Sequence, residues 1–458
     1  MTHRRGLRLA VLRETARTRL WPVPVAGVVL AVLAGLLLPV LDARLDAHLP
    51  GPVADVVFGG GAGAARTVLD AVASSLITVT SLTFSLTVVT LQLASSQFSP
   101  RLLRTFTQDR FVHGTLALFL ATFTYALTVL RTVRSPSDDG SGLASAAVVP
   151  RISVTVAFLL AVASVVCLVL FLGHLAREIR VETMLARVQT EACRTADLLY
   201  PSDGTVTSTP PDEEVVVPPS AVPVPATRSG FLSLVDEEAL LDVAVATGVT
   251  VVVGRLPGSS VVAGTPVAWC WTTSGDPVAP VDLDRVRAVV QTAVVVGPEP
   301  TQAQDLAFGL RQLVDVASKA LSPGINDPTT AVHAIGHASA FLCSIADRRL
   351  GDQVARDDEG VLRLVVRRPS VPDLLDLAVA QPLRYGAADP VVLTRVAALL
   401  GEVAWCTSRP LVLDAVGAQL ARLETVVDAQ AFDEVERARL QAEVDRARSA
   451  LTRATVAR

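Results

Sequence analysis

Two stretches of the chain carry polar side chains whose types and spacing suit binding or permeation chemistry. The first is residues 71–104, an apolar run crowded with serine and threonine. At 100° per residue, five of its polar residues fall on one face of a helix. Hydroxyl groups can replace part of the hydration shell of an ion or solute without carrying a fixed charge. The candidates for such a pore lining are Ser74, Thr78, Ser81, Ser85 and Gln92.

The same hydroxyls also have a purely structural explanation. Ser and Thr side chains can bond back to the carbonyl at i−4, and small residues allow close packing, so a tightly packed bundle helix remains the alternative. In both interpretations we expect both faces of this helix to meet protein or water. No acidic, basic or histidine residue occurs in residues 71–98, which disfavours proton-coupled chemistry in the middle of a membrane. The opposite face carries Thr80, Thr83, Thr87 and Thr90.

The second stretch is SKALSPGINDPTTAVHAIGH, residues 318–337. Asp327 directly before Pro328 predicts a helix N-cap with proline at the first helical position. A helix N-terminus beside a lysine is also suited to bind a phosphate or a carboxylate. A structural turn is the alternative explanation. The candidate ligand-binding residues are Lys319, Asn326, Asp327, Thr329 and Thr330.

His333 and His337 are four residues apart and share a helix face, which is the spacing of a metal site. The sequence HAIGH lacks the glutamate of HExxH and no third ligand is specified, so both are weak candidates, and we predict no metal site and no cofactor. No nucleophile elbow, phosphate-binding loop or carboxylate pair is evident, so we expect no enzyme. The basic residues are dispersed without aromatic interleaving, which disfavours nucleic-acid binding.

Most of these residues must be positioned by helices that cross a membrane. The chain has 458 residues, 51% of them apolar, and a mean hydropathy of +0.48, too hydrophobic for an ordinary soluble protein. Runs long enough to cross a hydrocarbon core of about 30 Å occur at residues 21–41, 71–93, 112–130 and 152–172. The first follows a basic arm, as a signal peptide would. Because it is longer than a typical signal core and no convincing cleavage site follows, we expect it to be retained.

The arginines predict the orientation of these spans. Residues 1–20 carry six arginines against one glutamate, which favours a cytoplasmic N-terminus. Arg101 and Arg104 mark the same side after the second span, although arginines in the loop at residues 131–151 weaken the pattern. The fourth span is expected to continue as one helix through residue 199. Both termini are then cytoplasmic.

The fold class that follows is a multi-pass α-helical membrane protein with four transmembrane helices and a C-terminal cytoplasmic α/β plus helical region. Strand patterns are predicted at residues 231–235, 249–257, 259–271 and 360–368, and a helix at 282–296. The predicted parts are a basic cytoplasmic arm (1–20), a four-helix transmembrane domain (21–176), a helix extension with a proline-rich linker (177–230), a small α/β module (231–281) and a mainly helical cytoplasmic region (282–458).

Two motifs, LQLASSQFSPRLLRTFTQDRF at residues 91–111 and ALSPGINDPTTA at residues 320–331, together resemble a family of predicted bacterial membrane proteins. That family is catalogued as domain of unknown function 2254. The resemblance spans most of the chain and implies a multi-pass protein of the bacterial plasma membrane. It implies no activity, substrate or catalytic residue.

Two hypotheses for function follow. One four-helix protomer with a single polar span has too few polar helices to enclose a transport path. We therefore expect several copies to form a homo-oligomer in the lipid bilayer, with their second helices around a common path. The first hypothesis is a channel for small ions or solutes regulated by the cytoplasmic region. The second is a membrane-anchored sensor or scaffold whose cytoplasmic region binds an anionic ligand or a protein partner near Lys319 and Asn326.

Overall fold

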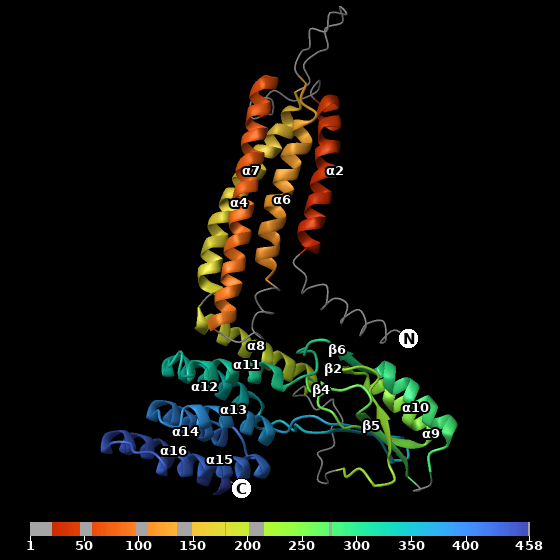
Figure 1. Ribbon diagram of the computed structural model, residues 1–458, viewed down its shortest axis with the longest axis vertical. Helices are drawn as coiled ribbons and strands as arrows, with labels where there is room; N and C mark the ends of the chain where they lie inside the picture. The colour runs from red at the N-terminus through yellow and green to blue at the C-terminus, as the bar shows by residue number, and fades with distance from the viewer. Residues whose placement is uncertain are drawn as a thin grey trace, which may run out of the picture. The chain divides into compact units, whose positions relative to one another are not determined.

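The structure is a computed structural model that describes residues 21–45, 57–97, 109–134, 149–178, 180–200, 215–273 and 277–456. The chain divides into two compact units, Met1–Arg180 and Val181–Arg458 (Figure 1). The basic arm at residues 1–20 lies outside the described residues. So do residues 201–214 of the predicted proline-rich linker.

The first unit contains four helices that are long and apolar enough to cross a membrane, which confirms the four predicted apolar spans. α6 is the central helix, since it packs against each of the others and 50% of its membrane-length window is buried, against 17–22% in the other three. The helices are α2 (Pro22–Leu45), α4 (Ala62–Gln97), α6 (Arg110–Leu130) and α7 (Arg151–Glu178).

Small residues bring α2 close to α6. A Cβ atom added to Gly35 of α2 would lie 2.8 Å from the Cβ of Thr128 on α6, closer than real side chains approach. In a membrane, lipid tails are as apolar as leucine, so helices associate through close packing of this kind. Gly35 therefore sets how near α2 can come to α6.

The fourth span does not continue as one helix to residue 199, so that prediction is wrong. α7 ends at Glu178, the N–H of Arg180 donates to the carbonyl of Arg177 at 3.2 Å, and α8 (Val181–Leu199) begins. α7 is apolar on all sides, whereas α8 has one apolar stripe that includes Met184 and Leu185 and is buried against α11 and α12. The break separates two segments with different burial requirements, and no turn residue marks it in the sequence.

The second unit contains two β-sheets. The larger has the order β1-β5-β3-β8-β7, in which β3 and β8 are parallel and the other pairs antiparallel. The smaller has the order β4-β2-β6. α9 (Glu237–Thr247) packs against β3 and β8, and α10 (Pro280–Ala293) against α9 (Figure 1). The strands are β1 (Val222–Pro225), β2 (Gly230–Val235), β3 (Val249–Val253), β4 (Ser260–Val261), β5 (Pro266–Thr272), β6 (Val294–Gly297), β7 (Gln353–Arg356) and β8 (Leu362–Val366).

All four predicted strand regions contain strands, but the predicted helix at 282–296 is wrong at its end. Val294–Gly297 forms β6, which pairs with β2, because a run of β-branched valines packs well in a sheet. β7 and β8 come from residues predicted as part of the helical region. The larger sheet therefore includes strands from both sides of the predicted boundary at residue 281. The division of the second unit into domains at residues 230 and 281 stays a prediction.

The remaining helices form the helical part of the second unit (Figure 1). Several begin where the sequence carries start signals, since Asp327, Ser370 and Asp389 cap the starts of α12, α13 and α14, each with proline in the first turn. These helices are α11 (Ala307–Ala320), α12 (Pro328–Ile345), α13 (Val371–Tyr385), α14 (Pro390–Trp405), α15 (Pro410–Asp428) and α16 (Glu434–Val456).

Candidate functional site

The predicted lining residues of α4 lie on the side of the helix that no other described helix covers. All five are exposed: Ser74, Thr78, Ser81, Ser85 and Gln92. On the opposite side, Thr80, Thr83 and Thr90 are 8%, 1% and 7% exposed, so that face packs inside the bundle. The expectation that the threonine face meets protein is confirmed. The serine face is open on the single chain.

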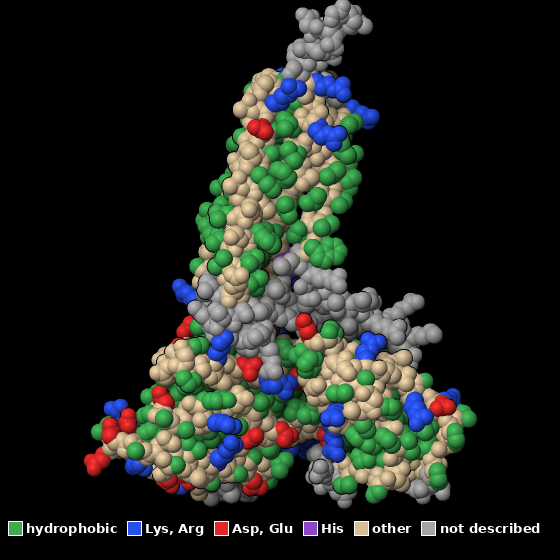
Figure 2. Space-filling model, in the orientation of Figure 1, with side chains coloured by type: hydrophobic (Ala, Val, Ile, Leu, Met, Phe, Trp, Pro, Cys, Tyr) green, Lys and Arg blue, Asp and Glu red, His purple; other side chains and the backbone are tan. Residues whose placement is uncertain are grey.

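Open polar positions in the middle of the bundle are confined to α4. The exposed side chains of α2 between residues 23 and 41, and of α7 between residues 158 and 172, are all apolar. Leu30 of α2 and Val169 of α7 are typical, at 66% and 65% exposed. Figure 2 shows the visible middle of the bundle in green, the colour of hydrophobic side chains, and tan, the colour of the backbone and of other side chains that are neither charged nor histidine. α2 and α7 therefore present the surface that lipid favours, whereas α4 presents hydroxyls beside exposed apolar residues such as Leu82 and Phe84.

Some hydroxyls on the open face of α4 are satisfied by their own helix. Ser74 Oγ donates to the carbonyl of Asp70 at 2.8 Å, and Thr78 Oγ1 donates to the carbonyl of Ser74 at 3.1 Å. Ser81 and Ser85 make no side-chain hydrogen bond to the described part of the chain. Their hydroxyls are available to water, a solute or another chain.

An acidic residue continues the open face at one end. Asp70 is exposed one turn before Ser74, and no described basic side chain pairs with its carboxylate. From Asp70 to Gln92 the face is about 33 Å long at 1.5 Å per residue, which matches the thickness of a hydrocarbon core. The polar stripe on α4, residues 70–92, is thus long enough to cross a membrane and carries a carboxylate at its start.

The polar groups inside the bundle, by contrast, bond to one another. Asp42 Oδ2 accepts the N–H of Ser153 at 3.0 Å and its hydroxyl at 3.2 Å, and Tyr125 donates to the carbonyl of Ser153 at 3.1 Å. Thr122 of α6 and Ser164 of α7 share a hydroxyl contact of 3.3 Å. These contacts join helices, so the bundle does not need the stripe on α4 for its own assembly.

The turn between α11 and α12 closes on itself. Asn326 has a φ of 50°, and the N–H of Asp327 donates to the carbonyl of Ala320 at 2.8 Å. The Asp327 carboxylate accepts the N–H of Thr330 at 3.0 Å and its hydroxyl at 2.5 Å. These hydrogen bonds from Thr330 lower the pKa of Asp327. The predicted N-cap is confirmed.

The same geometry bears on the predicted anion site. The Asp327 carboxylate takes the position at the start of α12 where an external anion would accept backbone N–H groups. Lys319 lies in the last turn of α11, Asn326 is exposed in the connection to α12, and Thr329 is exposed in the first turn of α12. Binding of a ligand by Lys319, Asn326, Asp327, Thr329 and Thr330 stays a prediction.

The two histidines of α12 face α8. His333 Nδ1 lies 3.5 Å from Glu182 Oε1, and His337 Nδ1 lies 2.5 Å from Gln189 Oε1. Burial, followed by the charge of His333, lowers the pKa of His337. Among the described residues, no group of three or more His, Cys, Asp or Glu side chains is arranged to hold a metal ion. The pair thus makes separate contacts between helices.

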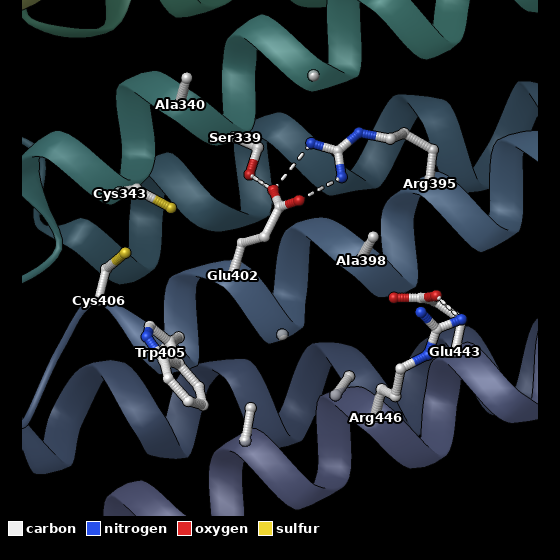
Figure 3. Close-up of a pocket in the computed structure, with 14 residues that line it drawn as sticks. Ser339, Ala340, Cys343, Arg395, Ala398, Glu402, Trp405, Cys406, Glu443 and Arg446 are labelled. Carbon is white, nitrogen blue, oxygen red and sulfur yellow. Dashed lines mark hydrogen bonds and ion pairs between the residues drawn. The ribbon is translucent and has the colours of Figure 1, made fainter.

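A pocket that the sequence did not reveal lies among α12, α14 and α16 and has a volume of about 560 Å³ (Figure 3). At its side, the Arg395 guanidinium donates to both oxygens of Glu402, at 2.9 and 2.8 Å, and Ser339 donates to the same carboxylate. Burial raises the pKa of Glu402, but the hydrogen bonds from Arg395 and Ser339 outweigh it and hold the pKa below its usual range. Cys343 and Cys406 line the same pocket.

Sequence patterns hold little signal for this pocket. Arg395 and Glu402 are seven residues apart on one helix face, which is the only local hint of their pairing. Ser339 and Cys343 come from a helix 63 residues away in the chain. Only the packing of α12 on α14 brings these groups together.

Comparisons with known proteins agree with the architecture. Residues 17–402 match the family described as Predicted membrane protein (DUF2254). Uncharacterized proteins of Mycobacterium bovis and Mycobacterium tuberculosis are each 37% identical to this chain over 423 residues, which are 91% of this chain and 78% of theirs. No solved structure matches. Because the family match extends from the first span into the last turn of α14, this chain belongs to the Predicted membrane protein (DUF2254) family.

Proposed function

We propose that this protein is an oligomeric channel in which the polar stripe of α4 from each copy lines a shared path for small ions or solutes. The observation that carries the proposal is the exposure of Ser74, Thr78, Ser81, Ser85 and Gln92, whereas every exposed side chain at residues 23–41 of α2 and 158–172 of α7 is apolar. A single copy in a bilayer would leave these groups against acyl chains, which offer no hydrogen-bond partner. A water-filled path at the centre of several copies satisfies them.

The internal contacts of the bundle support this reading over simple helix packing. Thr83 of α4 and Thr122 of α6 are buried inside the bundle, at 1% and 0% exposed, and Thr122 contacts Ser164 of α7. The stripe is a second, separate set of hydroxyls on a helix that already has its packing partners. Tight packing among the described helices therefore does not account for it.

The charge of the stripe favours cations. Asp70 stands exposed at its start, and copies around an axis would bring several such carboxylates to the mouth of the path. Rings of Asp or Glu are a common device for cation preference. The interior of the stripe has no fixed charge, so its hydroxyls act by partial replacement of a hydration shell.

The proposal places the protein in a bacterial plasma membrane with both termini and the second unit in the cytoplasm, following the arginine pattern. The second unit then serves as the regulatory part. Ligand binding at the α11–α12 turn is not required by this proposal.

Cysteine accessibility tests the proposal. In a variant whose native cysteines are replaced by serine, single cysteines are placed at Thr78, Ser81 or Ser85, and the protein in sealed vesicles is treated with a charged, membrane-impermeant thiol reagent. We expect modification at these positions at least tenfold faster than at the control positions Val165 and Val169 of α7, which are also exposed on the single chain. Equal protection of both sets would contradict a wet path along α4.

A further inference from the structure

The pocket in the second unit holds two thiols that face each other. Cys343 of α12 and Cys406 at the end of α14 are two of the chain's five cysteines, and both line it. Figure 3 shows their sulfur atoms directed toward one another. The Cys343 side chain interacts with the Cys406 thiol, so the two sulfurs are near neighbours.

Contacts on either side of the thiols fix this arrangement. One helical turn earlier on both helices, Ser339 of α12 donates to Glu402 of α14. Just beyond the thiols, Thr407 Oγ1 donates to the carbonyl of Ala346 at 3.0 Å. Cys343 and Cys406 each lie four residues after the first contact, in the same register. The packing of α12 on α14 therefore holds the sulfurs in position across a native interface.

The two thiols differ in their surroundings, as the members of an exchanging pair do. Cys406 is exposed and Cys343 is half-buried. Burial, together with the neighbouring Cys406, raises the pKa of Cys343 to about 12. Cys406 is thus the thiol that a small disulfide reaches first, while burial keeps Cys343 protonated beside it.

We propose that Cys343 and Cys406 are a reversible dithiol–disulfide pair that reacts with a low-molecular-weight disulfide held in this pocket. The pocket is large enough for such a molecule, at about 560 Å³. Its ion pairs, Arg395 with Glu402 and Arg446 with Glu443, offer both charges to the amino and carboxylate groups that small cellular thiols carry.

The reaction is a thiol–disulfide exchange in two steps. The Cys406 thiolate attacks one sulfur of the small disulfide RSSR, the S–S bond breaks, and RS⁻ leaves and takes up a proton. Cys343 then loses its proton and attacks the Cys406 sulfur of the mixed disulfide, which releases the second RSH. The two protein thiols lose two electrons in total and RSSR gains them, so no other oxidant is needed.

The test uses the full-length protein in detergent, with oxidised glutathione as the probe, followed by alkylation, digestion and mass spectrometry. The wild type should gain a Cys343–Cys406 link, keep no glutathione, and lose the link on treatment with dithiothreitol. Cys343→Ser should keep glutathione on Cys406, because the resolving thiol is gone. Cys270, which is buried, is the internal control and should remain unmodified.

The wild-type result decides the proposal even if a variant fails to fold. A stable glutathione adduct on Cys406 of the wild type without a link would overturn it, as would the absence of any reaction at a Cys406 that alkylates readily. Neither outcome bears on the path along α4, since this experiment reads only chemistry within the second unit.

Discussion

Asp42 near the end of α2 accepts the backbone N–H of Ser153, 3.0 Å away, in the first turn of α7. The N–H groups of a first helical turn have no acceptor within their own helix, so a residue 111 positions earlier in the chain caps α7. Ser153 also accepts a hydrogen bond from Tyr125 of α6. Ser153 thereby joins α2, α6 and α7. These buried polar groups of the bundle have hydrogen-bond partners, whereas the stripe on α4 is open.

Removal of the Asp42 carboxylate should destabilise the bundle. Asp42→Ala leaves the buried N–H and hydroxyl of Ser153 without their acceptor, at a cost of about 1–3 kcal/mol. Thermal unfolding in detergent should show a lower melting temperature. Asp70→Ala is the matched control, because Asp70 is exposed on α4, and it should melt with the wild type. A melting temperature for Asp42→Ala that equals the control's would refute the capping role.

Close contact between α2 and α6 predicts that Gly35 tolerates no larger residue. Gly35→Val would drive side-chain atoms into Thr128, and overpacking of this kind costs about 1–3 kcal/mol. Gly173→Val on α7 is the control, since nothing lies within 4 Å of a Cβ added there. The melting temperature of Gly35→Val should be lower than that of Gly173→Val. Equal losses in the two variants would mean that helix propensity, and not the contact with Thr128, causes the destabilisation.

The cap of α12 predicts a loss of stability that depends on pH. Asp327→Ala should cost about 1 kcal/mol, as loss of an N-cap does. Because the folded pKa of Asp327 lies below its usual 3.8, the charged cap stabilises the fold above pH 3.8, and this stabilisation is lost as the pH falls through the folded value. The neutral cap Asp327→Asn should therefore differ from the wild type in urea unfolding at pH 7 and converge with it in acid. A constant difference at all pH values would contradict the role of the charge.

The carboxylate at the start of the stripe predicts the selectivity of the path. Asp70→Asn should lower the ratio of cation to anion permeability of the reconstituted protein severalfold, because the charge at the mouth is removed. Reversal potentials under a salt gradient measure this ratio. Asp242→Asn, in the second unit, changes the same charge and should leave the ratio unaltered. A cation preference that survives Asp70→Asn would place selectivity elsewhere.

Local signals in the sequence were sufficient for much of the fold. The four apolar runs, the Asp327–Pro328 start of α12 and the valine-rich β3 each depend on neighbouring residues only, and each is present in the structure. The open face of α4 was also readable as a set of positions at helical spacing. What the periodicity did not reveal was that this face, rather than the threonine face, is left uncovered by the other helices.

Features that depend on contacts between residues distant in the sequence could not be predicted from local patterns. β8 pairs in parallel with β3 across more than a hundred residues, and β6 follows a helical pattern in the sequence but pairs with the distant β2. The contact between Ser339 and Glu402, and with it the thiol pair, depends on how α12 packs on α14. No local pattern encodes such packing, so the pocket among these helices appears only in three dimensions.

The most direct measurement is a structure of the purified protein assembled in lipid nanodiscs, with bound lipid resolved. Our account predicts several copies around one axis, with Thr78, Ser81 and Ser85 of each α4 turned toward a water-filled centre and the apolar faces of α2 and α7 in contact with lipid. Acyl chains packed directly on Ser81 and Ser85 in every copy would contradict it.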